Sequence, residues 1–293
     1  MYNSIRCALK ETSTMLRLTL MRSKALVAFI GLIVILSASL RPVGDTAREL
    51  NAKLNVFEPF IMLLNTGDSI PSQFFYIYMF FIVLCCDLGV TDKYFAYRYI
   101  RIPRSSWVVS SILNIVVLSA MYIAFVMALS LLWFIGSIEA GNNWSRLVVS
   151  MARTNIVQTN HLNMYIEGSI IKVYTPAQAF GYSAMYLFAY LFMSGMFISF
   201  IHSTFKRSYA TPAVVLLILY LWDYIVIYYL PYSYEQFSLP ALARLISLNN
   251  GYSIWAPSLQ YAGIAWGALC TVLIIAQILG SCRFEVSMSG SHT

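Results

Sequence analysis

The sequence contains very few charged residues for its length. Only 11% of its 293 residues are Asp, Glu, Lys or Arg, and 59% are hydrophobic, whereas a soluble domain carries about 25% charged residues. This composition excludes an ordinary soluble globular protein. The net charge of +7 does not indicate nucleic-acid binding, because an excess of Lys and Arg in so apolar a chain is typical of the cytoplasmic loops of membrane proteins.

Motifs for nucleotide binding and for catalysis are also missing. No Gly-Lys dipeptide occurs in the chain, so a Walker A phosphate-binding loop cannot form. Neither G-x-S-x-G nor H-E-x-x-H is present, and the three histidines, His161, His202 and His292, are far apart. We therefore expect no catalytic residue, no metal site and no cofactor on this chain, and we do not expect it to be an enzyme.

Long apolar runs account for most of the sequence. A helix needs about 17 to 25 apolar residues to cross a bilayer, because its backbone polar groups must all be paired within the helix. The sequence predicts an all-α polytopic membrane protein whose single transmembrane domain covers 25–281, followed by a tail at 282–293. The six predicted spans are 25–40, 70–86, 107–135, 177–201, 209–230 and 259–281. The first two are short, and tilt would adjust them to the membrane.

The basic residues are distributed unequally between the two sides that six spans would create. The side with both termini carries 12 Lys and Arg in about 63 residues, and the other side carries seven in about 99. The positive-inside rule therefore predicts that both termini and the loop at 87–106 are cytoplasmic.

Residues 1–24 show a helical pattern of their own. Arg6, Lys10, Arg17 and Lys24 fall within a narrow arc at 100° per residue. The opposite arc is apolar and contains Ile5, Ala8, Leu9, Met15, Leu16 and Leu20. We interpret this segment as an amphipathic helix on the cytoplasmic leaflet. The alternative is an ordinary basic flank to the first span.

The loop between the fifth and sixth spans carries helix signals. Ser238 can cap a helix, Pro240 suits a first turn, and Asn250 with Gly251 can end it. We expect a helical element here, on or dipping into the outer membrane interface.

A few polar and small residues within the spans are candidates for a role. Asp223 is the one acidic residue deep in a span, so it is either a proton or substrate site or a structural carboxyl bonded to a tyrosine or across a subunit interface. The structural interpretation is favoured because no acid, His or Lys accompanies Asp223 at that depth. Asn114 is predicted to join two helices, and Gly263 and Gly267 form a small-xxx-small step for close helix packing.

The basic loop between the second and third spans reads "DLGVTDKYFAYRYIRIPRSSW". With its acidic start and R-x-x-W end, six spans, an amphipathic N-terminal helix and no motor, the chain resembles the permease subunit of bacterial type-2 ABC exporters. The resemblance implies that 94–104 is a coupling helix that docks on an ATPase. The residues of that segment expected to contact the ATPase are Tyr94, Tyr97, Arg98, Arg101 and Arg104.

The resemblance also implies partners and a location. A separate P-loop ATPase would bind ATP and Mg, and a second permease, identical or not, would complete the transport path. The chain would lie in the bacterial cell membrane, in contact with lipid, and export a hydrophobic or amphipathic substrate such as a toxin or antimicrobial peptide. Two alternatives stay open: a motor-free secondary transporter or channel that uses Asp223 as its ion or proton site, and a membrane scaffold or immunity protein.

Overall fold

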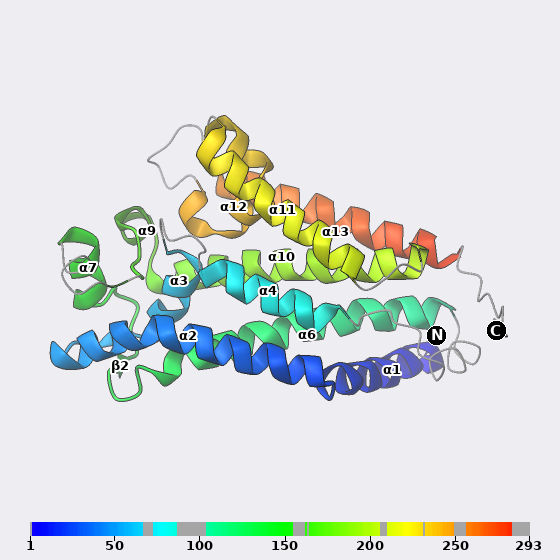
Figure 1. Ribbon diagram of the computed structural model, residues 1–293, viewed down its shortest axis with the longest axis horizontal. Coiled ribbons are helices and arrows are strands. Elements are labelled where there is room, and N and C mark those ends of the chain that lie inside the picture. The colour runs from blue at the N-terminus through cyan, green and yellow to red at the C-terminus, as the bar shows by residue number, and fades with distance from the viewer. Residues whose placement is uncertain are drawn as a thin grey trace.

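The computed structural model is a bundle of long helices with a cap of short elements at one end (Figure 1). It describes residues 2–66, 73–86, 104–154, 162, 164–205, 210–230, 232–248 and 256–282. The long helices are α1 (Tyr2–Leu20), α2 (Ser23–Glu49), α4 (Gln73–Cys85), α6 (Arg104–Leu132), α10 (Pro176–Phe205), α11 (Ala210–Tyr229) and α13 (Leu259–Cys282). From α2 onward these helices run alternately in opposite directions (Figure 1).

Within the described residues, four helices are long and apolar enough to cross a membrane, which fits the predicted all-α membrane protein. They lie at Ser23–Glu49, Ser105–Leu132, Pro176–His202 and Leu259–Gly280. The apolar helices at Gln73–Cys85 and Val214–Val226 are shorter. A helix rises about 1.5 Å per residue, so the described part of α4 is too short to cross a hydrocarbon core of about 30 Å by itself.

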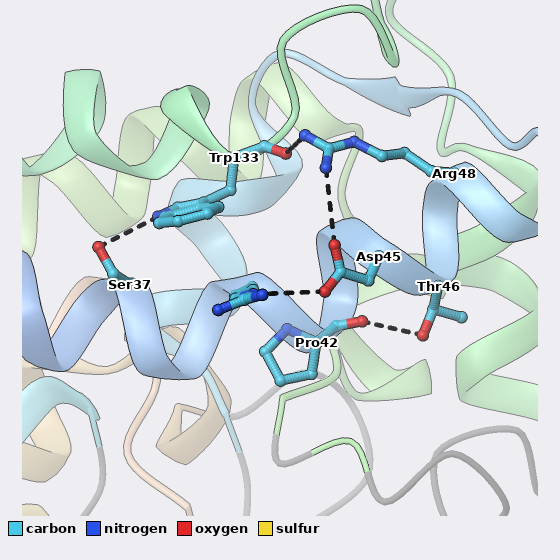
Figure 2. Close-up of polar contacts among 7 residues, drawn as sticks. Ser37, Pro42, Asp45, Thr46, Arg48 and Trp133 are labelled. Carbon is cyan, nitrogen blue, oxygen red and sulfur yellow. Dashed lines mark hydrogen bonds and ion pairs between the residues drawn. The ribbon is translucent and has the colours of Figure 1, made fainter.

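Helix α2 extends well past the predicted end of the first span at residue 40. It continues through Pro42 to Glu49, although proline removes one backbone donor from a helix. Figure 2 shows what holds the extension: Trp133 Nε1 donates to Ser37 Oγ at 3.2 Å, and Arg48 donates to the Trp133 carbonyl at 3.1 Å. The Asp45 carboxylate also pairs with two arginines: its Oδ2 lies 3.6 Å from Arg41 Nε, and its Oδ1 lies 3.6 Å from Arg48 Nη1.

The contact with Trp133 contributes more to this extension than the ion pairs do. The side chains of Asp45, Arg41 and Arg48 are at least half exposed, and such pairs are worth about 0 to 1 kcal/mol. Gly44, in contrast, is buried, and a Cβ atom there would lie 3.0 Å from the Trp133 carbonyl oxygen. The absence of a side chain at Gly44 therefore lets the end of α6 approach the backbone of α2.

Helix α1 packs along the start of α6 (Figure 1). Ala8 and Thr12 are buried, and Thr12 Oγ1 contacts the Ser110 carbonyl oxygen at 3.3 Å. Ala8 belongs to the predicted apolar arc, but Leu9 of the same arc is 56% exposed. Leu18, which is outside that arc, is 50% exposed. The face of α1 turned to the protein is therefore narrower than the predicted apolar arc and includes a polar threonine.

The cap is built from short elements of three loops. It contains α3 (Glu58–Leu64), α7 (Arg146–Arg153), α9 (Gly168–Val173) and α12 (Leu239–Ala243), the 3₁₀ helices η1 (Tyr232–Phe237) and η2 (Leu245–Ser247), and the paired strands β1 (Leu54–Asn55) and β2 (Ile138–Glu139). The two strands are parallel, with Leu54 opposite Ile138. All seven residues of α3 are buried, so this segment between the first two predicted spans lies inside the cap.

Two glycines set the closest helix contacts of the bundle. A Cβ atom at Gly31 of α2 would lie 2.5 Å from the Phe80 ring of α4, and one at Gly195 of α10 would lie 2.7 Å from the Ile115 side chain of α6. Both distances are shorter than van der Waals contact, so a side chain at either position would require Phe80 or Ile115 to move.

The fold predicts a position-dependent effect of alanine in α10. Gly195→Ala should lower the free energy of unfolding by about 1–3 kcal/mol, because the added methyl overpacks the contact with Ile115. Gly181→Ala is the matched control, since nothing lies within 4 Å of a Cβ atom there, and it should be neutral or stabilise the helix by up to about 1 kcal/mol. Unfolding in detergent monitored by circular dichroism measures both; equal effects would contradict the packing role of Gly195.

Candidate functional site

The bundle and the cap meet at a buried group of polar residues, here called the polar junction: Asn65, Ser183, Asp223, Ser238 and Arg244. Asp223 lies six residues before the end of α11, about 9 Å along the helix, and is 3% exposed. Its Oδ2 accepts a hydrogen bond from Arg244 Nη2 at 3.0 Å, and its Oδ1 accepts one from Ser238 Oγ. The cap thus supplies both donors to a carboxylate of the bundle.

This arrangement corrects the expected surroundings of Asp223. The sequence favoured a structural carboxyl bonded to a tyrosine or across a subunit interface, with no acid, His or Lys at its depth. In the structure the charge of Arg244 lies against it, because the segment after α11 folds back into the bundle instead of staying outside it. Ser238 also caps α12, as predicted, by accepting a hydrogen bond from Ala241 N.

Arg244 is itself nearly buried. Its side chain is 11% exposed, and its guanidinium carbon lies 5.9 Å from the centre of the Phe74 ring of α4. The cation therefore has an ionic partner on one helix and an aromatic face on another.

Asn65 connects three elements at the junction. Its Nδ2 donates to Ser183 Oγ of α10 at 3.0 Å, and its Oδ1 accepts from Ile246 N of η2 at 3.2 Å. Asn65 is fully buried, so each of these hydrogen bonds would be costly to lose. The amide fixes the end of α3 against both α10 and the segment that carries Arg244.

Aromatic side chains surround the junction on the bundle side. The Tyr190 ring of α10 lies 4.5 Å from the Tyr78 ring, 5.6 Å from the Phe74 ring and 5.7 Å from the Trp266 ring. Trp266 Nε1 of α13 donates to the Leu242 carbonyl of α12 at 3.1 Å. The rings exclude water from one side of the junction, which strengthens its hydrogen bonds and raises the cost of leaving a charge unpaired.

Glu235, in η1, is a second acid near the junction in the described part of the chain. Burial raises the pKa of Glu235, the positive charge of Arg244 opposes that rise, and the negative charge of Asp223 adds to it. Arg244 thus lies near two acids, and Asp223 is the one that accepts its hydrogen bond.

The polar junction predicts strongly non-additive effects on stability. Arg244→Met should cost about 3–5 kcal/mol, because it leaves a buried carboxylate without its cation. The double variant Asp223→Asn/Arg244→Met should cost less than Arg244→Met alone, because no unpaired charge remains. Arg41→Met, which removes an exposed ion pair, should cost at most about 1 kcal/mol. Unfolding midpoints in detergent test this order, and strictly additive costs would contradict the coupling.

A second set of buried polar residues joins three helices nearer the other end of the bundle. Gln277 Nε2 of α13 donates to Ser199 Oγ of α10 at 3.3 Å, and Ser199 Oγ lies 3.1 Å from Ser111 Oγ of α6. Asn114, one turn along α6, is 2% exposed, and its Oδ1 has no hydrogen-bond partner among the described residues. Ser111, Ser199 and Gln277, which the sequence did not single out, make the hydrogen bonds that join the three helices at this level.

The two glycines expected to bring helices together lie on the outward side of α13. Gly263 and Gly267 are both exposed. A Cβ atom at Gly263 would lie 3.8 Å from the Tyr186 hydroxyl, and one at Gly267 would meet nothing within 4 Å. Within the described part of the chain, Gly263 and Gly267 make no close contact with another helix. Gly31 and Gly195 are the glycines at close helix contacts there.

Most of the predicted ATPase contact lies outside the described residues, namely Tyr94, Tyr97, Arg98 and Arg101. Arg104 is the first residue of α6, so the segment enters this helix at the end of the bundle where α1 packs. Across the described ranges, no group of three or more His, Cys, Asp or Glu side chains could hold a metal ion.

Glu58 is a buried carboxyl within the cap. Its Oε2 accepts a hydrogen bond from Asn55 N at 2.8 Å, and its Oε1 accepts one from Ser145 N at 2.6 Å. Burial raises the pKa of Glu58, and these hydrogen bonds oppose the rise. The side chain joins β1 to the start of α7, two segments far apart in sequence.

The raised pKa of Glu58 predicts a pH dependence of stability. A folded-state pKa above the ordinary value of 4.5 means that the folded protein holds the proton more tightly. This contribution to the free energy of unfolding is complete below pH 4.5 and is lost as the pH rises through the folded pKa. Glu58→Gln removes it, so the stability difference between wild type and variant should shrink with rising pH. Thermal unfolding at several pH values measures this, and a constant difference would contradict the raised pKa.

A signal in the sequence could have found the partner of Asp223. Arg244 stands alone among apolar residues in "LPALARLISL", as Asp223 does in its span. Two isolated opposite charges in apolar segments are candidates for a pair, because each is costly to bury by itself. Asn65 offers no comparable signal, since its role depends on where α3 ends in space.

Comparison with known proteins identifies no relative: no family model matches the chain, and neither does any curated protein or solved structure.

Proposed function

We propose that this chain is the transmembrane permease subunit of an ATP-driven ABC exporter in a bacterial cell membrane. The observation that carries the proposal is the arrangement of the helix ends. The start of α1, the start of α6 and the end of α13 lie together at the end of the bundle opposite the cap (Figure 1). The segments that join that end are the ones richest in Lys and Arg, which suits a cytoplasmic surface.

Six passes through the membrane are part of the proposal. The alternation of α2, α4, α6, α10, α11 and α13 (Figure 1) supports them, with α4 and α11 as the two shorter spans. The buried helix α3 packs against α4, which lets the cap fill the space that a short helix leaves. Both termini would then be cytoplasmic and the cap would face outward.

In this proposal the basic loop at 94–104 transmits motion from the ATPase to α6. Helix α1 packs on α6 close to the start of that helix, with the buried contact between Thr12 and Ser110. A force on the loop would therefore move α1 and α6 together. The Ser111–Ser199–Gln277 hydrogen bonds connect the same part of α6 to α10 and α13, which carry the contacts to the cap.

The polar junction would close the outer end of the path. Its segment at 232–248 is held to the bundle by Asp223, Asn65 and Trp266 through hydrogen bonds to Arg244, Ile246 and Leu242. A substrate that is hydrophobic or amphipathic suits the aromatic surroundings, and an amphipathic peptide such as a toxin or antimicrobial peptide is the class we favour. A second permease, identical or different, would supply the other wall.

The alternative of a motor-free transporter with Asp223 as its ion or proton site gains no support from the junction. A carrier carboxyl has to exchange its ligand, whereas Asp223 is held by Arg244 and Ser238. A guanidinium at 3.0 Å already occupies the position that a transported cation would need.

Co-purification tests the proposal directly. The purified chain alone should hydrolyse no ATP, and turnover should appear when its separate P-loop ATPase partner is added. Arg98→Ala/Arg101→Ala should weaken the complex markedly, since charge-assisted hydrogen bonds are worth about 1.5–3 kcal/mol each. The matched control is Arg41→Ala/Arg48→Ala, two arginines at the capped end, which should leave binding unchanged.

Orientation is measured on the same variants. A cysteine at the exposed Ser105 should be protected from an impermeant thiol reagent in intact cells, with the unsubstituted protein as background. Protection combined with undiminished ATPase binding in Arg98→Ala/Arg101→Ala would refute docking through these arginines. Robust ATP turnover by the chain alone would refute the assignment of the motor to a separate subunit.

A further inference from the structure

We propose that the cap contains a binding site for a soluble acidic peptide that presents a free amino group. The site is a cavity of about 770 Å³ between the turn after α2 and the loop from β2 to α7. Ligand sites commonly have volumes of about 300–1,000 Å³, so a short peptide segment fits. Binding at this cavity does not depend on the proposed function.

Three charged side chains at the cavity are unpaired. Lys53, Glu139 and Arg146 all line it and are exposed. None of the three side chains forms a hydrogen bond or ion pair with another residue in the described ranges. Two cations and one anion that face a common space match a ligand with carboxylates and an ammonium group.

The uncharged lining suits a peptide backbone. Asn51, Asn143, Ser145 and Ser150 contribute amide and hydroxyl groups, which can donate and accept hydrogen bonds as an amide backbone does. A nucleotide would bring several negative charges next to Glu139, and an uncharged sugar would leave the three charges unused. A peptide with both kinds of charge uses the whole set.

The wall of the cavity is preformed by partly buried hydrogen bonds. Asn55 Nδ2 donates to the carbonyls of Gly141 and Asn143 at 2.6 Å and 3.1 Å, and Glu58 accepts from Ser145 N. Trp144 Nε1 donates to the Tyr174 carbonyl at 2.8 Å. These bonds hold the loop that carries Glu139 and Arg146, so little ordering would be needed on binding.

The position of the cavity argues against a lipid head group as the ligand. Arg41 ends the apolar part of α2, and the helix continues through exposed charged residues to Glu49. At about 1.5 Å per residue, the cavity lies roughly 12 Å beyond Arg41. In Figure 1 the capped end of α2 extends beyond the other long helices. The site therefore opens to water rather than to the membrane surface.

Binding of three synthetic pentapeptides to the full chain in lipid nanodiscs tests this inference. The probes are a free-ended peptide with two aspartates, its N-acetylated form, and a free-ended peptide with two lysines. We expect saturable binding of the first, about tenfold weaker binding of the third, and a several-fold loss on acetylation. Lys53→Glu and Arg146→Glu should each weaken binding of the aspartate peptide by about tenfold or more.

Two controls make the result specific. Glu139→Gln should bind the free-ended and the N-acetylated aspartate peptides equally, because the amino group no longer has an anion to pair with. Both peptides are measured on the same variant, so a folding defect would affect both measurements equally. Arg153→Glu reverses an exposed cation of α7 outside the cavity lining and should bind as wild type. No saturable binding, equal binding of all three probes, or unchanged binding by Lys53→Glu and Arg146→Glu would overturn the proposal. The assay contains no ATPase, so its failure is distinct from failure of the motor proposal.

Discussion

A carboxylate buried between helix α11 and the cap is the constraint on which the capped end depends. Asp223 is too deep in α11 to reach bulk water, and removing an ion from water without a partner costs several kcal/mol. The protein meets this cost by folding the segment after α11 inward, so that Arg244 and Ser238 face the carboxylate. The positions of η1, α12 and η2 follow from that requirement, together with Asn65 and Trp266, which hold the same segment at two further points.

Different interactions hold the capped end and the helix contacts along the bundle. At the capped end, charged and amide groups specify one arrangement, because each would be costly to leave unpaired. Along the bundle, glycines at Gly31 and Gly195 permit close contact with Phe80 and Ile115, and contact area rather than charge provides the attraction. A permease of the kind we propose needs both properties, since its outer end must close specifically while its helices shift against one another.

The cap itself divides into a part that closes the bundle and a part that projects from it. The segments around Asn65 and Arg244 lie against α10 and α11, whereas the cavity with Lys53 and Arg146 lies beyond the end of the apolar helix surface. Glu58 joins β1 to the loop before α7 and so keeps the projecting part rigid. A ligand bound there would meet the protein in water, at a distance from the junction that closes the bundle.

The sequence alone determined the helical membrane character, because each backbone polar group in a bilayer must be bonded within its own helix and long apolar runs satisfy this locally. It also determined that Asp223 needs an explanation and that Ser238 can cap a helix. Only the tertiary structure decided that Arg244 is the partner of Asp223, that α3 is buried, and that α2 continues past Pro42 against Trp133. It likewise decided which glycines make close contacts, since Gly263 and Gly267 look as suitable in the sequence as Gly31 and Gly195. These outcomes depend on contacts between residues far apart in the chain, and no periodicity within one segment encodes the position of another.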